Sequence, residues 1–128
     1  MDRSTLELII TNSLNNERLD IRRAAVDAFK GRDNIPLEWI EMVLKDKDWH
    51  VRIAAIESFE SRNDVPLKWI ETALKDEDWH VRRAAVEVFK GRDDIPLEFI
   101  ETALKDEDRD VQIELLNVLF DLYFKEGN

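Results

Sequence analysis

Apolar residues recur along the chain at spacings of three and four, the pattern of helices that bury one face. Three stretches carry nearly the same stripe. These stripes are Leu37, Ile40, Leu44; Leu67, Ile70, Leu74; and Leu97, Ile100, Leu104. An aromatic residue widens each of them: Trp39, Trp69 and Phe99. Each stretch predicts a short amphipathic helix, with Pro36, Pro66 or Pro96 at its first helical position.

A further apolar stripe follows two of these helices after a short KDxD turn. Its residues are Val51, Ala54, Ala55 and Phe59, and then Val81, Ala84, Ala85 and Phe89. Asp48, Asp78 and Asp108 stand just before the second stretches, where a carboxylate caps the free N–H groups of a helix. We therefore expect a second helix after each aspartate, with the paired alanines allowing close packing of the backbones.

The two helices form a unit that repeats every 30 residues, since residues 49–78 and 79–108 are identical at 21 of 30 positions. A fixed period of this length is typical of solenoids, in which each unit is too small to bury its own apolar face. The sequence predicts an all-α fold, a right-handed α-solenoid of four stacked helix pairs in a single domain, 1–128. The repeat units are expected at about 4–31, 35–61, 65–91 and 95–126.

The first pair departs from this template. Its first helix is predicted to run from Ser4 to Leu14, with Ser4 as the cap and Glu7 completing a capping box. The apolar positions of that helix are Leu6, Ile9, Ile10 and Leu14. Its second helix is expected to end at Gly31. The residues predicted to be buried in this second helix are Ile21, Ala24, Ala25, Ala28 and Phe29.

The last helix, predicted from Asp108 to about Lys125, is apolar nearly all round. A helix that closes a solenoid normally turns a polar face to water. We therefore expect this helix either to wrap over the end of the core or to contact another chain. Self-association through the apolar C-terminal helix is one of the predicted interactions.

The chain is acidic, with 29 Asp and Glu against 19 Lys and Arg and a formal net charge of -10. That balance disfavours nucleic acid as a partner. The absence of cysteine excludes disulfides and thiolate metal sites, and favours a cytoplasmic protein. The sequence predicts no membrane segment, because it has neither a long apolar run nor a secretory signal. No phosphate-binding loop or nucleophile motif occurs, so we predict no cofactor, no resident metal and no catalysis.

The positions that the core stripes leave free on the second helices form an outward row. This row consists of Arg23, Asp27 and Lys30; His50, Ile53, Glu57 and Glu60; His80, Arg83, Glu87 and Lys90; and Asp110, Ile113, Asn117 and Phe120. The repeats differ most along it, and Ile53 and Ile113 stand where the other two carry arginine. The row is predicted to bind a protein or peptide of basic or mixed charge. The alternative is that the row is a solvent-exposed face without a partner, whose residues vary between repeats because nothing constrains them.

Two other sets of side chains are weaker candidates. His50 and His80 occupy the same position in neighbouring repeats, but helices packed about 8–10 Å apart hold two imidazoles too far apart to share one ion readily. Trp49 and Trp79 either cover the seam between repeats or form an aromatic shelf for a planar ligand.

Arginines also recur in the loops between repeats. They are Arg32, Arg62 and Arg92, and the acids expected to neutralise them are Asp33, Asp64 and Asp93. An arginine beside a helix C-terminus interacts favourably with the helix dipole. We therefore expect a structural role for these residues rather than phosphate binding.

The words DWHVRIAA and DWHVRRAA, preceded by LKDKD and LKDED, resemble HEAT repeats, in particular the short HEAT-like repeats of phycobilin lyase subunits. In that family an aspartate in the inter-helix turn and an arginine six residues later form a ladder from repeat to repeat. The resemblance implies this role for Asp46 with Arg52 and for Asp76 with Arg82. Asn16 and Gln112 depart from the motif at either end, which is interpreted as a sign of terminal units in a complete protein.

The resemblance implies a binding scaffold that presents its second helices along a concave surface. It leaves open a lyase-like or chaperone subunit that holds a tetrapyrrole or another planar ligand. A weaker alternative is nucleic-acid binding, because one branch of HEAT-like proteins excises damaged DNA bases. The identity between repeats also fits an engineered or recently duplicated chain. The fold alone does not choose among these functions.

Overall fold

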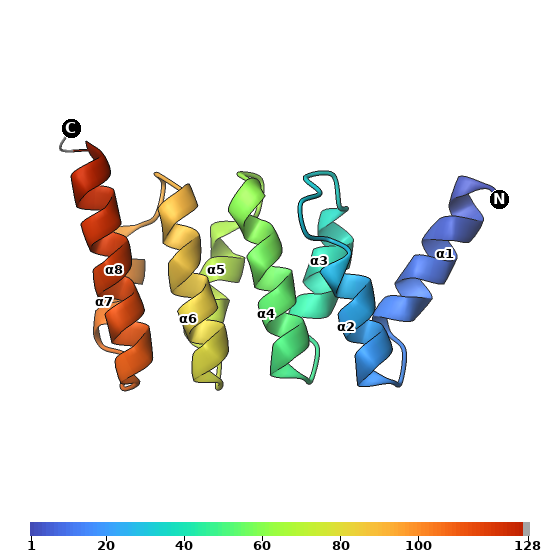
Figure 1. The fold of residues 1–128 in the computed structure, drawn as a ribbon, viewed down its shortest axis with the longest axis horizontal. Coiled ribbons are helices and arrows are strands. Elements are labelled where there is room, and N and C mark those ends of the chain that lie inside the picture. Colours follow the sequence, from blue (N-terminus) through green and yellow to red (C-terminus); the bar gives the residue numbers. More distant parts are fainter. Residues whose placement is uncertain (127–128) are drawn as a thin grey trace. The chain divides into compact units, whose positions relative to one another are not determined.

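Eight α-helices and two short 3₁₀ helices make up the described part of the chain, and no β-strand occurs in it (Figure 1). The computed structural model describes residues 1–126, without the side chains of Ser61 and Glu126. The helices are α1 (Arg3–Leu14), α2 (Leu19–Asp27), α3 (Leu37–Leu44), α4 (Trp49–Glu57), η1 (Ser58–Ser61), α5 (Leu67–Leu74), α6 (Trp79–Glu87), η2 (Val88–Gly91), α7 (Leu97–Leu104) and α8 (Arg109–Glu126). The predicted all-α solenoid of helix pairs is confirmed.

The helices group into two compact units, Met1–Ser61 and Arg62–Asn128. In the first unit, α1 packs on α2, α3 packs on α4, and α2 lies beside α4. In the second unit, α5 packs on α6, α7 packs on α8, and α6 lies beside α8. Within each unit the second helices of consecutive pairs are therefore neighbours, which is the arrangement that stacked repeats require.

The predicted core of the second helices is confirmed in the two middle pairs, except that Ala54 and Ala84 are only half-buried. Ala55 and Ala85 are completely buried, so small side chains occupy the positions where helix backbones come close. Phe59 and Phe89 are each 1 % exposed, although they lie in η1 and η2 rather than in the α-helices. The last turn tightens to a 3₁₀ helix, a frequent geometry at helix ends, and still places the ring in the core.

The second helices begin as predicted, and the first helices begin one residue later. Asp48, Asp78 and Asp108 each accept the backbone N–H two residues ahead, at 2.8 to 2.9 Å. Pro36, by contrast, is the N-cap, with an extended ψ of 135°, and the other two prolines are placed in the same way. The carbonyl of Pro36 accepts the N–H of Trp39 at 3.0 Å, so the proline contributes the first acceptor of the helix rather than its first helical residue.

Replacing Asp48 with alanine is expected to lower the free energy of unfolding by about 1 kcal/mol at neutral pH. Asp48→Asn, which keeps a capping oxygen, is expected to lose only part of this. Urea denaturation of the three proteins measures both values. Equal losses in the two variants would contradict a capping role for the side-chain oxygen.

The Asp48 cap also predicts a dependence on pH. Burial raises the pKa of Asp48, but hydrogen bonds from the backbone N–H and ring of His50 and from the N–H of Val51 together outweigh it, so the pKa lies below its ordinary value. A carboxyl of this kind stabilises the fold above its unfolded pKa of about 3.9 and loses that contribution as the pH falls through the folded value. The stability difference between wild type and Asp48→Asn should therefore shrink below about pH 4.

Arginine and aspartate side chains join neighbouring repeats inside each unit. In the first unit, Arg22 Nε lies 2.9 Å from Asp46 Oδ2, and both side chains are 7 % exposed. In the second unit, Arg82 Nε lies 2.8 Å from Asp106 Oδ2. Arg82 also donates from Nη1 to the backbone carbonyl of Asp76, at 2.8 Å. Each of these two arginines thus binds the carboxylate of the following repeat and the turn backbone of its own.

Asp46 and Arg52 are therefore in contact, as the family resemblance implies, but through a hydrogen bond to the backbone carbonyl and not through an ion pair. Arg52 Nη1 donates to the carbonyl oxygen of Asp46 at 2.8 Å, while the Asp46 carboxylate belongs to Arg22. The residue six positions after the aspartate fixes the turn of its own repeat. The ion pair is made with the arginine of the preceding repeat.

Asn16 and Gln112, which replace the aspartate and the arginine of the ladder, keep its hydrogen bonds to the backbone of the turn. Gln112 Nε2 donates to the carbonyl oxygen of Asp106, as arginine does in the other repeats. Asn16 Oδ1 accepts the N–H of Arg18 at 2.9 Å, the same turn bond that Asp46 and Asp106 accept. Both substitutions preserve the turn while removing a charge.

The first helix is less buried than its pattern suggests. Asp2, and not Ser4, caps α1, because its carboxylate accepts the N–H of Thr5 at 2.7 Å. Leu14 is 2 % exposed, as predicted. The other residues of its predicted apolar stripe are 38 to 49 % exposed: Leu6, Ile9 and Ile10.

The second helix of the first pair also departs from prediction. Phe29 is buried and Ala25 is half-buried, but Ala24, Ala28 and Ile21 are exposed. Val51, one repeat after Ile21, is completely buried and has the preceding second helix, α2, beside it. The helix itself ends at Asp27 and not at Gly31 as predicted, since residues 28–31 form turns. Gly31 has a φ of +78°, the left-handed conformation expected of a glycine after a helix.

The C-terminal helix α8 has one buried face and one exposed face. Val111, Leu115 and Val118 are completely buried where α8 packs on α6 and α7. Leu116 and Phe120 are 52 % and 63 % exposed. The helix therefore covers the core of its unit and still leaves an apolar surface open.

Candidate partner-binding surface

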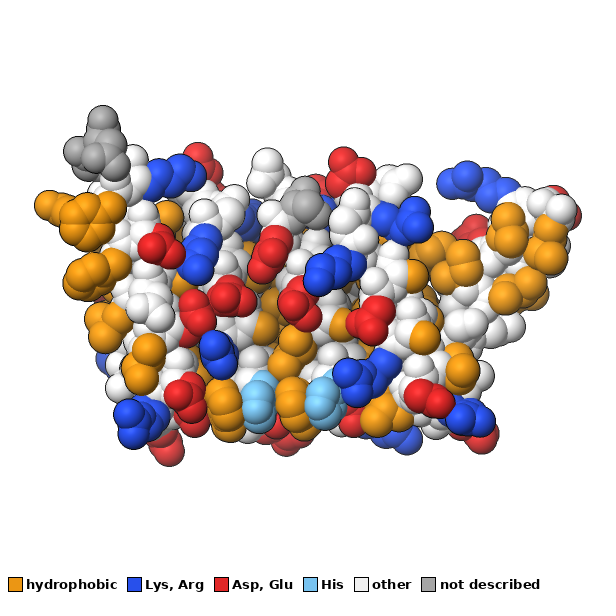
Figure 2. Space-filling model, in the orientation of Figure 1, with side chains coloured by type: hydrophobic (Ala, Val, Ile, Leu, Met, Phe, Trp, Pro, Cys, Tyr) orange, Lys and Arg blue, Asp and Glu red, His pale blue; other side chains and the backbone are white. Residues whose placement is uncertain are grey.

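The second helices of the first unit carry the outward row as an exposed, mixed-charge surface. Figure 2 shows acidic and basic side chains interleaved over the second helices. Arg23, Asp27 and Glu57 are exposed, and Ile53 is half-buried. The remaining row positions of this unit are exposed at Lys30 and Glu60 and half-buried at His50. The predicted row therefore reaches solvent in this unit.

A hollow separates α2 from α4 within this unit. It has a volume of about 350 Å³. Its lining residues are Val26, Asp27, Lys30, Ala54, Glu57 and Ser58. Three of these are row residues: Asp27, Lys30 and Glu57. Val26 and Ala54 are the apolar residues of this lining, so the hollow combines charged and apolar surface.

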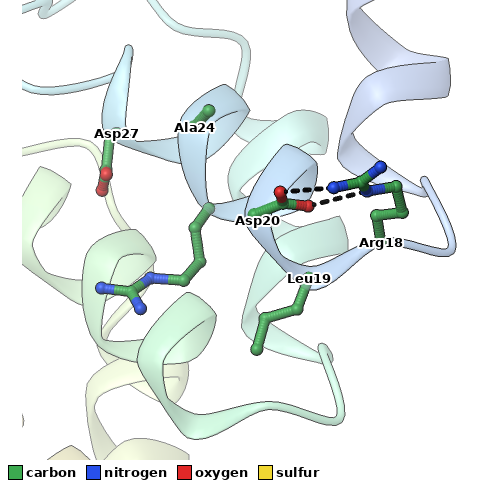
Figure 3. Close-up of a pocket in the computed structure, with 6 residues that line it drawn as sticks. Arg18, Leu19, Asp20, Ala24 and Asp27 are labelled. Carbon is green, nitrogen blue, oxygen red and sulfur yellow. Dashed lines mark hydrogen bonds and ion pairs between the residues drawn. The ribbon is translucent and has the colours of Figure 1, made fainter.

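A second hollow of about 650 Å³ lies along α2, and Figure 3 shows it. Arg18 and Asp20 flank it and form a two-point ion pair, with Nε and Nη2 of the arginine 3.1 and 2.9 Å from the two carboxylate oxygens. Leu19 and Asp27 also line it. Asp27 belongs to both hollows, so the two depressions form adjoining parts of one surface.

The charges of this surface are available to a partner. Within the described residues, the side chains of Arg23, Asp27, Lys30 and Glu57 form no ion pair. An exposed charge without an internal partner can pair with a ligand without first breaking an existing bond. Such pairs fix the register and steer the approach of a charged partner.

The row is different in the second unit, where two of its basic residues already hold carboxylates of α8. Arg83 Nε lies 3.4 Å from Glu114 Oε1, and Lys90 Nζ lies 3.5 Å from Asp121 Oδ2. Glu114 is 7 % exposed, so Arg83 compensates a buried charge. Sequence reasoning placed Arg83 in the row as a binding residue and missed this partner. The acid at 114, where other repeats carry alanine, was the available signal.

The other row positions of the second unit differ in exposure. Ile113 is 44 % exposed and Phe120 is 63 % exposed, so both apolar members of the row lie open on α8. The remaining members are exposed at Lys90, Asp110 and Asn117 and half-buried at His80 and Glu87.

The two histidines have local partners. His50 Nδ1 lies 3.1 Å from Asp48 Oδ1, and His80 Nδ1 lies 3.0 Å from the corresponding aspartate. Each imidazole also stacks on the tryptophan before it, with ring centroids 3.6 and 3.7 Å apart. One face of Trp49 and of Trp79 is therefore taken by its own neighbour, which weakens the idea of a shelf for a planar ligand. No cluster of three metal-ligating side chains occurs among the described residues.

The loop arginines have structural partners, although not all of the predicted ones. Arg62 pairs with Asp64 at 2.7 Å, as expected, but Arg92 pairs with Asp94 at 2.7 Å and not with Asp93. Arg92 Nη1 also donates to the carbonyl of Val65 at 2.7 Å, and so ties consecutive loops of the second unit together.

Arg32 differs from the other loop arginines. Its Nε donates to the carbonyl of Ala28, the C-cap of α2, at 2.9 Å, so the partner is a backbone carbonyl rather than Asp33. Asn34 stands in this repeat where the other two repeats carry Asp64 and Asp94, so the carboxylate that binds their arginines is missing here.

The repeat geometry agrees with a comparison against protein families. The model of HEAT repeats matches residues 36–119, which run from the start of α3 into α8. The chain belongs to the HEAT-repeat family. HEAT repeats commonly serve as protein-interaction scaffolds, and the exposed second helices of this HEAT-repeat chain suit that use. No curated protein matches the chain. Within the described residues, no helix is both long and apolar enough to cross a membrane.

Proposed function

We propose that the chain is an interaction scaffold that binds a protein or peptide along the second helices of its first unit. The hollow between α2 and α4 carries this proposal, because it is lined by three charged row residues that form no ion pair with any described side chain. Two of them, Asp27 and Glu57, are acidic, and Glu60 adds a third carboxylate on the α4 side. The partner expected here is a segment with basic residues and a small apolar side chain.

The half-buried Ile53 supports a contact that includes apolar surface. The equivalent residues of the first and third repeats are Arg23 and Arg83. Ile53→Arg therefore introduces a side chain that the fold accepts at this position elsewhere. It should leave stability nearly unchanged, as surface substitutions usually do, within about 0.5 kcal/mol. Its effect on binding then reports the contact itself.

Selection of peptides from a random phage-displayed library, followed by calorimetry, tests the proposal. Wild-type protein should select peptides enriched in Lys or Arg. Glu57→Lys should raise their Kd about tenfold or more, equivalent to about 1.4 kcal/mol, and Ile53→Arg should act in the same direction. Binding should also weaken with salt, because exposed charges are screened.

Glu41→Lys is the matched control, since Glu41 is exposed on the first helix α3 and the substitution changes net charge by the same amount. It should leave the Kd within about twofold. Selected peptides that bind Glu57→Lys and Ile53→Arg as tightly as wild type would contradict the proposed surface. The stacking of His50 on Trp49 and of His80 on Trp79 disfavours a lyase-like role with a planar ligand, and the acidic charge disfavours nucleic acid.

A further inference from the structure

The large apolar side chains left open to solvent gather at the two ends of the chain. Between residues 22 and 96 of the described chain, no large hydrophobic side chain is exposed to a comparable degree. Those of the first helix pair are Leu6, Leu8, Ile9, Ile10, Leu19 and Ile21. Those of the last pair are Leu97, Leu104, Ile113, Leu116, Phe120, Tyr123 and Phe124. Contiguous open apolar surface of this kind marks an interaction site.

Two exposed residues of the last pair, Leu116 and Leu104, stand at positions that stacking buries in other repeats. Leu116 is 52 % exposed, whereas Val26 and Val86, at the same repeat position, are 1 % and 0 % exposed. Val26 and Val86 belong to helices that have a following second helix beside them in their own units, α4 and α8 respectively. Leu104 is likewise 52 % exposed, against 4 % for Leu74. The last pair therefore presents the apolar face on which a following repeat would stack.

The first pair presents the complementary face. Ile21 is 38 % exposed, whereas Val51 and Val111, at the same repeat position, are completely buried beside a preceding second helix, α2 and α6 respectively. A groove of about 580 Å³ lies beside it, between α1 and the segments that follow. Among the apolar residues that line the groove are Leu6, Ile9, Ile10, Ala25, Ala28 and Phe29. Figure 2 shows hydrophobic side chains gathered on α1.

We propose that the last helix pair of one molecule stacks on the first helix pair of a second copy of the chain, head to tail. The register follows from the stacking inside each unit, where α2 lies beside α4 and α6 lies beside α8. In the same register, α8 of one copy lies beside α2 of the next. Leu116 and Val86 occupy the same repeat position, and so do Ile21 and Val111. Leu116 of one copy therefore lies against Ile21 of the next, in the register that α6 and α8 have within the second unit.

The C-terminal turns of α8 match the groove in this register. Phe120 and Phe124 follow Leu116 by one and two helical turns, and their rings contact each other with centroids 6.3 Å apart. The end of α2 and the turn after it, including Ala28 and Phe29, line the groove. Parallel stacking of the second helices places the aromatic end of α8 at this end of α2. Burying aromatic rings there removes the largest apolar areas from water.

The polar residues at the two ends fit the same junction. Inside a unit the ladder pairs an arginine with the aspartate of the next repeat, both of them largely buried. Across the proposed junction the corresponding residues are Gln112 of one copy and Asn16 of the other. A charge left unpaired in such an interface is strongly destabilising, and two amides remove that cost because each can donate and accept.

Sedimentation velocity of the wild-type protein, measured at a series of increasing protein concentrations, tests the proposal. The 15.1 kDa chain should form larger species, because the two faces differ and head-to-tail contacts propagate into rings or open chains. Association should strengthen between about 0.1 M and 1 M NaCl, as screening of the acidic copies improves. This is opposite to the salt dependence expected for peptide binding, so the two proposals fail independently.

Leu116→Glu and Ile21→Glu, each at a position already exposed, should be monomeric with unchanged melting temperatures. An equimolar mixture of the two should form a dimer and go no further, since each variant keeps one intact face. Phe120→Glu provides a second variant of the C-terminal face should Leu116→Glu fold poorly. Thr72→Glu, exposed on α5, adds the same charge elsewhere and should associate like wild type.

Three outcomes overturn the proposal. If the wild-type protein stays monomeric at every protein and salt concentration, the two faces do not bind each other in solution. Loss of association in Leu116→Glu but not in Ile21→Glu shows a symmetric contact between two α8 helices instead. A mixture of the two variants that stays monomeric while wild type associates shows that the two faces do not bind each other.

Discussion

Replacing Phe89 with alanine is expected to lower the free energy of unfolding by about 3–5 kcal/mol. The ring is 1 % exposed and lies in η2, directly after α6. Truncation leaves a cavity in a repeat that has no separate core of its own, so the loss is felt by the stacked neighbours in the unit. Urea denaturation followed by circular dichroism measures the change.

Phe120→Ala is the matched control, because the same side chain is removed from a position that is 63 % exposed. At a protein concentration where the chain is monomeric, it should cost less than about 0.5 kcal/mol. Similar losses in the two variants would show that the buried and exposed positions on the second helices are assigned wrongly.

Replacing Arg22 with alanine in the wild-type protein is also expected to lower the free energy of unfolding by about 3–5 kcal/mol. The variant leaves the carboxylate of Asp46, whose side chain is 7 % exposed, without its ion partner. It also removes two hydrogen bonds from Nη1, to the carbonyls of Asn16 and Glu17 at 2.8 and 3.1 Å. The same denaturation experiment gives the value.

Gln112→Ala removes a side chain at the corresponding position that makes one backbone hydrogen bond, to Asp106, and it should cost only about 1 kcal/mol. The double variant Arg22→Gln with Asp46→Asn recreates the amide residues that the chain carries at 112 and 16. It should lose less stability than the sum of its two single variants, because no buried charge remains unpaired. Strict additivity would contradict the inter-repeat ion pair.

The fold was predictable because its signals are local and repeated. The position of Asp48 before an apolar stripe specifies a helix start, and the 30-residue period specifies stacking. Both features can be predicted without knowledge of which helices pack on each other. The start of α3 was misplaced by one residue because Pro36 fixes φ but leaves ψ free, and both the N-cap and the first helical position accept its φ of −57°.

Burial at the ends of the array could not be read from the same pattern. Ile21 has the periodicity of a core residue, yet its burial depends on a neighbouring helix that internal repeats have and the first pair lacks in the described structure. The pairing of Arg83 with Glu114 likewise depends on the stacking of α6 on α8, across 31 residues of sequence. The inter-repeat ion pairs join side chains 24 to 31 residues apart, so the local helical spacing does not identify them.

Nuclear magnetic resonance of labelled protein, titrated with a peptide selected by the wild type, tests the proposed function most directly. The account predicts that the largest amide shifts occur around the hollow between α2 and α4, at Asp27, Lys30, Ala54 and Glu57, and that Glu57→Lys abolishes them at the same peptide concentration. Shifts concentrated on the first helices α3, α5 and α7, with those four amides unmoved, would contradict it.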